Sequence, residues 1–152
     1  MPASVEPMRP TPAAKPFSDP NWLFEPKWDG WRTSCFLREG KAHLVSRRRN
    51  SLDERFPELR EIGKVIKADA ALIDGEIVAL GEDGLPRFDA LRSRGHKYSI
   101  VFYAFDLLYL DGFDLTQCPL VKRKALLNYL TQRKHRSRAL HRSCKWKRRT
   151  TL

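Results

Sequence analysis

The sequence lacks the features that define secreted and membrane proteins. Its three cysteines, Cys35, Cys118 and Cys144, are odd in number and show no paired spacing, which argues against a disulfide framework and a zinc site. No apolar run approaches the roughly 18 residues that a membrane-spanning helix needs. The chain begins with proline-rich sequence instead of the basic and then apolar pattern of a signal peptide. We therefore expect a soluble, unsecreted protein in a reducing cytosol.

Acidic residues are missing from the end of the chain. Residues 133–152 contain nine Lys and Arg and no Asp or Glu, whereas residues 1–132 contain 20 basic and 18 acidic residues. The formal net charge of +11 is therefore the sum of +9 from this tail and +2 from the rest. The tail is either a solvated, disordered end or an arm that contacts nucleic-acid phosphates, and composition leaves both readings open.

Composition and apolar pattern divide the chain into three parts. Residues 1–20 contain six prolines and are expected to form an extended leader. Residues 21–132 carry the apolar periodicity of one folded domain, and residues 133–152 form the basic tail, where that periodicity is lost.

Within the predicted domain, antiparallel strands alternate with helices, which indicates an α+β fold. The strands are expected at residues 22–25, 30–37, 42–46, 71–80 and 99–110. Gly40 supplies the turn of a hairpin between the second and third of these strands. Helices are expected at residues 56–67 and 120–130, where apolar residues recur at intervals of three and four.

Two of the predicted strands carry carboxylates among apolar residues. Period two puts Asp74 and Glu76 on one face of their strand, and it puts Asp106 on the same face as Ala104 in the later strand. Because a strand so rich in aromatic residues mostly fills a core, Asp106 either belongs to a site or caps a turn inside the fold.

The segment from Glu25 to Arg32 places a lysine, two carboxylates and an arginine between two predicted strands. Lys27 follows a proline that ends the preceding strand, so its side chain is expected to be presented at a corner. A lysine amine attacks phosphorus only after losing its proton, and desolvation or nearby cations favour the neutral form. The Lys-x-Asp-Gly pattern is short enough to occur by chance, so an ordinary surface turn is the alternative reading.

Further segments resemble, in order and approximate spacing, the motifs of ATP-dependent DNA ligases and related covalent nucleotidyltransferases. The segments are residues 24–32 (nucleophile motif), 46–50 with 56–59 (the next motif), 72–78 (acidic motif) and 102–112 (aromatic motif). The resemblance covers about residues 21–130 and is strongest to the bacterial end-joining ligases of the DNA ligase D type. It implies part of the ligase adenylation-domain fold, in which helices flank antiparallel sheets in an ATP-grasp-like arrangement.

The resemblance assigns the covalent chemistry to Lys27. Its amine would form lysyl-AMP through a phosphoramide bond and release pyrophosphate from ATP. Glu25 would accept a hydrogen bond from the adenine amino group, and Phe105 would stack on the ring. RNA ligases and messenger-RNA capping enzymes share the lysine chemistry, but residues 105–112 look more like those of DNA ligases.

The resemblance assigns the phosphate, ribose and metal contacts to three further residues. Arg32 and Arg47 would hold the ribose or the phosphates, since a guanidinium can donate two parallel hydrogen bonds to a phosphate. Glu76 would contact the ribose or help to position a metal ion. Mg²⁺ is implied as the cofactor that offsets the charge of the triphosphate.

The partners implied by the resemblance are nicked or broken double-stranded DNA with 5′-phosphates and a bacterial Ku-like end-binding protein, in the nucleoid of a bacterial cytoplasm. The corresponding role is DNA repair and recombination by non-homologous end joining. The alternative is a non-enzymatic remnant that acts at most as a basic nucleic-acid-binding protein.

Two later elements of the ligase core have no clear counterpart. No acid follows Asp114, so the Glu-Gly element is missing, and Lys145-Trp146-Lys147 imitates the Lys-x-Lys element without a strand pattern before it. We therefore expect a chain truncated or frame-shifted near residue 133, which by itself does not complete nick sealing.

Overall fold

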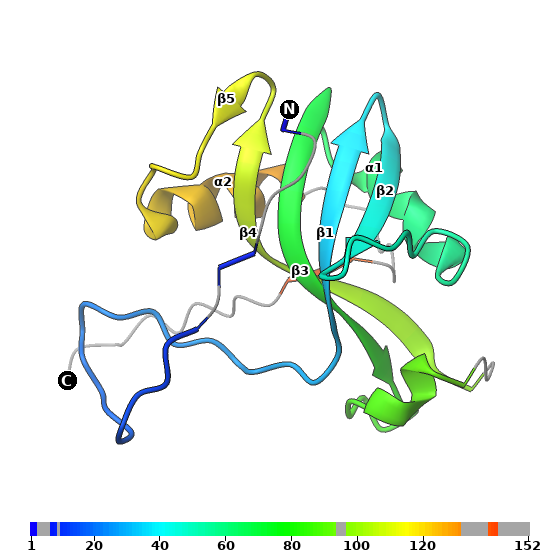
Figure 1. Ribbon diagram of the computed structural model, residues 1–152, viewed down its shortest axis with the longest axis horizontal. Coiled ribbons are helices and arrows are strands. Elements are labelled where there is room, and N and C mark those ends of the chain that lie inside the picture. The colour runs from blue at the N-terminus through cyan, green and yellow to red at the C-terminus, as the bar shows by residue number, and fades with distance from the viewer. Residues whose placement is uncertain (3–6, 9, 94–96, 132–139, 143–152) are drawn as a thin grey trace.

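A computed structural model describes residues 1–2, 7–8, 10–93 and 97–131, together with the backbone of residues 140–142. One curled, twisted sheet dominates the structure, with the strand order β2-β1-β3-β4-β5 and β6 beside β4 (Figure 1). The strands are β1 (Trp31–Arg38), β2 (Lys41–Ser46), β3 (Ala70–Leu80), β4 (Ser99–Leu110), β5 (Phe113–Asp114) and β6 (Leu140–Arg142). Neighbours from β2 to β5 are antiparallel, and β6 joins β4 in parallel.

The predicted hairpin is confirmed, and its turn has a simple backbone cause. Glu39 and Gly40 have φ angles of 49° and 72°, so both central residues of the turn lie in the left-handed region. Two-residue turns of this kind match the right-handed twist of the strands they connect. The strand predicted at residues 22–25 is wrong, because this segment is irregular and its aromatic side chains gather around Phe17 instead.

In the view of Figure 1, the α-helices α1 and α2 lie behind the sheet. The structure replaces the helix predicted at residues 56–67 by a 3₁₀ helix, η1 (Pro57–Glu61), and one α-helical turn, α1 (Ile62–Val65). The three-residue spacing of the buried Leu59 and Ile62 suits a 3₁₀ helix. A second 3₁₀ turn, η2, spans Phe88–Leu91. The predicted helix at residues 120–130 is confirmed as α2 (Leu120–Thr131).

The core lies between the helices and one face of the sheet. The sheet contributes Cys35, Ile73, Ile77, Phe102 and Leu107, and the helices contribute Leu59, Ile62, Leu127 and Leu130. Alternation along the strands turns Arg32, Asp74 and Glu76 to the opposite face, as expected for the two carboxylates. We call the sheet face that carries Arg32, Asp74, Glu76 and Asp106 the polar face.

A β-bulge in β4 corrects the predicted position of Asp106. Asp74 is paired with Asp106, whereas its neighbour Gly75 is paired with Ala104, so Phe105 is an extra residue in β4. The prediction that Asp106 shares the face of Ala104 is therefore wrong. One inserted residue reverses the alternation beyond it, which turns Asp106 to the polar face.

The turn of the first hairpin packs directly on α1. We therefore expect a methyl group added at this contact to lower the stability of the fold. A Cβ on Gly63 would lie 2.0 Å from the carbonyl oxygen of Gly40. Because backbone must then move, we expect Gly63→Ala to lower the free energy of unfolding by about 2 kcal/mol or more in urea denaturation.

Gly84→Ala is the matched control, because a Cβ there meets nothing within 4 Å and only the φ of 74° is unfavourable. It should lower the free energy of unfolding by about 1 kcal/mol. Equal losses in the two variants would show that the Gly40–Gly63 contact has no role in stability.

Candidate functional site

The loop that carries Lys27 is fixed to the polar face on its C-terminal side. The indole of Trp28 stacks on the ring of Tyr103 in β4, with centroids 3.7 Å apart and planes 11° from parallel. Gly30 approaches β3 so closely that a Cβ would lie 2.2 Å from the carbonyl oxygen of Ile77. Lys27 itself is exposed, as expected for a presented side chain. The loop is thus held in place without burying the lysine.

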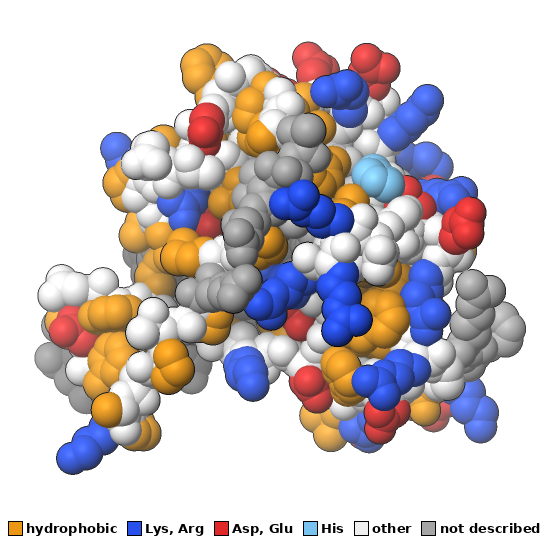
Figure 2. All heavy atoms as spheres, in the orientation of Figure 1, with side chains coloured by type: hydrophobic (Ala, Val, Ile, Leu, Met, Phe, Trp, Pro, Cys, Tyr) orange, Lys and Arg blue, Asp and Glu red, His pale blue; other side chains and the backbone are white. Residues whose placement is uncertain are grey.

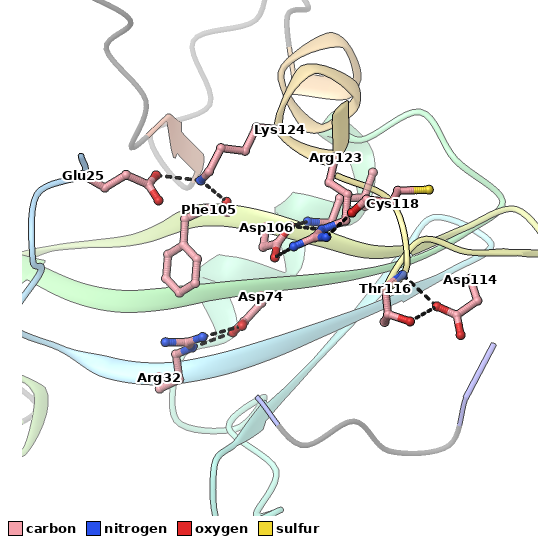
Figure 3. Close-up of polar contacts among 11 residues, drawn as sticks. Glu25, Arg32, Asp74, Phe105, Asp106, Asp114, Thr116, Cys118, Arg123 and Lys124 are labelled. Carbon is pink, nitrogen blue, oxygen red and sulfur yellow. Dashed lines mark hydrogen bonds and ion pairs between the residues drawn. The ribbon is translucent and has the colours of Figure 1, made fainter. Parts of the chain in front are cut away.

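Arg32, Asp74 and Phe105 meet across three adjacent strands (Figure 3). Arg32 donates hydrogen bonds of 2.7 and 2.5 Å to the two carboxylate oxygens of Asp74. Its guanidinium also lies over the Phe105 ring, 4.5 Å from the centroid. Burial lowers the pKa of Arg32, but the hydrogen bond and charge of Asp74 outweigh that effect and raise it above the ordinary value. Arg32 is therefore a fixed cation beside an aromatic ring.

Glu76 lies beside this pair, opposite Arg32 of β1 and Tyr103 of β4 in the strand register. Its side chain is half-buried, and desolvation raises its pKa from 4.5 to about 7. The charge of Arg32 and a hydrogen bond from the Gly30 backbone lower the pKa in part, whereas Asp74 adds a like charge that raises it. The polar face thus holds a carboxyl group that changes its charge near neutral pH.

Helix α2 contributes two buried cations that the sequence analysis missed. Lys124 donates hydrogen bonds to Glu25 Oε1 at 2.7 Å and to the Phe105 carbonyl oxygen at 2.6 Å. Arg123 holds both carboxylate oxygens of Asp106 at 2.8 and 2.9 Å (Figure 3). Arg123 and Lys124 lie four and three positions before the buried Leu127, so helical spacing places both cations on the buried face, and this signal could have revealed them.

Of the six residues assigned by resemblance, Arg32, Glu76 and Phe105 lie together, and Glu25 reaches Phe105 through Lys124. Arg47 follows Ser46, the register partner of Thr33, so it lies at the end of β2 near the start of β1. Its side chain is exposed and forms no ion pair with a described residue. The fold thus brings Arg47 to the border of the site without fixing it there.

The surface seen in Figure 2 is uneven in charge. Lys and Arg side chains gather in front of β1, β3 and the loops below them, while apolar groups mark the N-terminal segment. Phe17, Trp22 and Phe24 of that segment are 46%, 61% and 61% exposed. The basic groups surround a face with buried carboxylates, an arrangement that suits an anionic ligand with hydrogen-bond donors.

Metal and membrane features are limited in the described part of the chain. No three His, Cys, Asp or Glu side chains come close enough there to hold a metal ion by themselves. No described helix has the length and apolar character needed to cross a membrane. The candidate Lys145-Trp146-Lys147 element lies outside the described residues.

Comparison with solved structures defines the class of the fold. A mycobacterial DNA ligase D complexed with ATP and MES superposes with a TM-score of 0.62 and 36% sequence identity. The match covers 68% of this chain and 35% of the ligase chain. The curled antiparallel sheet with few helices is the fold of the DNA ligase adenylation domain, as the sequence predicted.

The family follows from the sequence comparisons. Residues 5–151 match the ATP dependent DNA ligase domain, and the chain belongs to this family. It is 37% identical over 109 residues to the multifunctional non-homologous end joining DNA repair protein LigD of Mycobacterium tuberculosis, covering 72% of this chain and 14% of LigD. It is 32% identical over 130 residues to the SPbeta prophage-derived DNA ligase-like protein LigB of Bacillus subtilis, covering 83% of this chain and 47% of LigB. The chain thus spans less than half the length of these relatives.

The raised pKa of Glu76 predicts that its charge destabilises the fold. The unfolded chain releases this proton near pH 4.5 and the folded chain near pH 7, so folding stability falls as the pH rises through that window. We expect Glu76→Gln to raise the free energy of unfolding at pH 8 by about 1 kcal/mol, after allowance for solvent at the half-exposed side chain.

The gain should disappear near pH 4, where Glu76 is protonated in both states. Urea denaturation of both proteins at the two pH values measures it. If Glu76→Gln is less stable than the parent at pH 8, then Arg32 and the Gly30 amide stabilise the carboxylate more than burial destabilises it.

Proposed function

We propose that Lys27 is the nucleophile of an ATP-dependent DNA ligase adenylation reaction in this chain. The main support is the arrangement around Lys27, which is exposed on a loop that Trp28 and Gly30 fix beside Glu76. The membership of the ligase domain family supports the same assignment. The chemistry requires a reachable amine at a fixed place, and the loop meets both requirements.

In the proposed reaction, the lone pair of the neutral Lys27 Nζ attacks the α-phosphorus of ATP. A phosphorus–nitrogen bond forms, and the bond from that phosphorus to the bridging oxygen of pyrophosphate breaks. The bonding electrons leave with pyrophosphate, and the amine loses its remaining extra proton to solvent. The product is lysyl-AMP, from which the AMP would pass to the 5′-phosphate of a DNA break.

Base recognition would use Phe105 and Glu25. The Phe105 ring is a stacking surface for adenine, and the Glu25 carboxylate is an acceptor for its amino group. Arg32 covers one side of the ring at 4.5 Å. Adenine stacked on that side would displace the guanidinium, which could then hold the ribose or phosphates while Asp74 retains it nearby.

The carboxylates of the polar face are consistent with a Mg²⁺ ion bound mainly by ATP. Asp74 and Asp106 are each held by two hydrogen bonds from an arginine, and Glu76 is not held in this way. Magnesium commonly binds one or two carboxylates, substrate phosphates and water, so Glu76 is the residue that fits this role. The ion would offset the triphosphate charge as the amine approaches, and Arg47 would add a phosphate contact.

The proposed substrate is nicked or broken double-stranded DNA in end joining. The M. tuberculosis relative is described as a non-homologous end joining DNA repair protein, which supports this choice. A Ku-like end-binding protein as partner, and a place in the nucleoid, are part of the same proposal.

Incubation with ATP and Mg²⁺, followed by intact-mass spectrometry, tests the proposed nucleophile. We expect the protein to gain one AMP and Lys27→Ala to gain none, because the loop presents the Lys27 amine, whereas the Lys124 ammonium is buried and paired with Glu25. Lys41→Ala is the matched control, since Lys41 is exposed in β2 and outside the loop.

Salt-sensitive DNA binding by a folded protein that gains no AMP would instead favour the non-enzymatic, basic nucleic-acid-binding alternative. Labelling retained in Lys27→Ala would show that another group is the nucleophile.

The close approach of Gly30 to β3 predicts a second effect on the same reaction. Gly30→Ala would place a Cβ 2.2 Å from the Ile77 carbonyl oxygen and 2.9 Å from Glu76 Cγ, so the loop must move away from the sheet. We expect the rate of AMP transfer to fall by about tenfold to a hundredfold, because small displacements of a nucleophile have large effects. Unchanged transfer in Gly30→Ala, measured beside Gly84→Ala, would show that the loop position is unimportant.

A further inference from the structure

Lys124 is a buried cation that joins two parts of the candidate base-binding site. Its side chain is 3% exposed, although lysines are rarely buried. Its ammonium donates to Glu25 Oε1 at 2.7 Å and to the carbonyl oxygen of Phe105 at 2.6 Å (Figure 3). One side chain of α2 therefore holds both the carboxylate assigned to the adenine amino group and the backbone of the residue assigned to stacking.

The bulge in β4 explains why the Phe105 contact matters for the ring. Phe105 is the extra residue between Ala104 and Asp106, so it has no register partner in β3. The Lys124 ammonium fixes its carbonyl, and Arg123 fixes the carboxylate of the next residue, Asp106. Helix α2 thus sets the backbone from which the Phe105 ring projects toward Arg32 (Figure 3).

The ion pair with Glu25 is the other half of the arrangement. Glu25 belongs to an irregular segment, and this contact with α2 crosses 99 positions of the sequence. A buried ammonium is stable only with well-placed acceptors, and removing one partner leaves an uncompensated charge. The pair therefore restricts the Glu25 carboxylate to one place beside the Phe105 backbone.

We propose that Lys124 is a positioning residue for adenine recognition, acting through the Glu25 carboxylate that it holds beside the Phe105 carbonyl oxygen; this inference rests on the proposed ATP-dependent function. A carboxylate held in one orientation accepts the 6-amino hydrogen of adenine more effectively than a freely rotating one, because less conformational freedom is lost on binding. A purine without the 6-amino group gains nothing from that orientation. Lys124 should therefore affect ATP much more than purine riboside triphosphate.

The test measures the rate of nucleotide transfer to the full chain against the concentration of ATP or of purine riboside triphosphate. For Lys124→Met we expect the KM for ATP to rise about tenfold, a typical effect of weakening one hydrogen bond to a charged group. The KM for purine riboside triphosphate and the maximal rates should change less than about twofold. Lys124→Arg, which keeps the charge and donors, should recover most of the preference for ATP.

Two further variants distinguish a role of Lys124 in positioning Glu25 from a role in stabilising the fold. Lys122→Ala removes an exposed lysine two positions earlier in α2 and should behave as the parent protein. In a Glu25→Gln background, Lys124→Met should change the KM for ATP by less than about twofold, because both substitutions disrupt the same contact. Equal rises in KM for both nucleotides, or additive effects in the double variant, would overturn the positioning role.

The role of Lys124 can still be tested if a variant does not fold or if the protein does not transfer AMP to itself. If Lys124→Met does not fold, the proposal is tested with Lys124→Arg and Glu25→Gln. The proposal holds if Glu25→Gln loses the preference for ATP and Lys124→Arg keeps it. Any other result overturns it. If the parent protein binds ATP but gains no AMP, the proposed nucleophile fails, and the same comparison of variants by dissociation constants judges Lys124. If the parent protein binds neither nucleotide, both proposals are overturned.

Discussion

Strand β3 pairs along its length with β1 and β4, and this double pairing places the central groups of the candidate site, Arg32, Asp74 and Glu76. It buries one face of β3 in the core and turns Asp74 and Glu76 to the other. Arg32 and Tyr103 then lie next to these carboxylates because they occupy neighbouring register positions on the flanking strands. The same pairing fixes Gly30 against Ile77 and so determines where Lys27 is presented.

The carboxylates of the polar face differ in how completely protein cations neutralise them. Asp74 and Asp106 each have an arginine that holds both oxygens, whereas desolvation leaves Glu76 with a pKa of about 7. A site that binds an anionic nucleotide with a cation needs a carboxylate that is not already neutralised by a protein cation. Under the proposed function, Glu76 would meet this need at the expense of folding stability, a common compromise at functional sites.

Helix α2 links the core to the site. Its apolar residues Leu127 and Leu130 pack under the sheet, and on the same side Arg123 and Lys124 reach the bulge in β4. The hydrophobic packing of the helix therefore also determines the positions of two ionic contacts. Under the proposed function, this arrangement would let core substitutions distant from the base alter base recognition.

The sequence by itself determined the family, the α+β class, the hairpin, the two long strands and the final helix. These features depend on local rules: positive φ at Glu39 and Gly40, alternation along β3, and helical spacing of Leu127 and Leu130. The residues of the ligase-like motifs could also be recognised from sequence, because each motif is a short continuous segment.

Only the tertiary structure decided the face of Asp106, the position of Arg32 over Phe105 and the pairing of Glu25 with Lys124. A bulge arises from how two strands fit together, and it reverses alternation without a mark in the local pattern. The Glu25–Lys124 pair joins segments 99 positions apart, so no periodicity connects them. Local sequence identifies which groups are available, and the packing of strands and helix determines which of them meet.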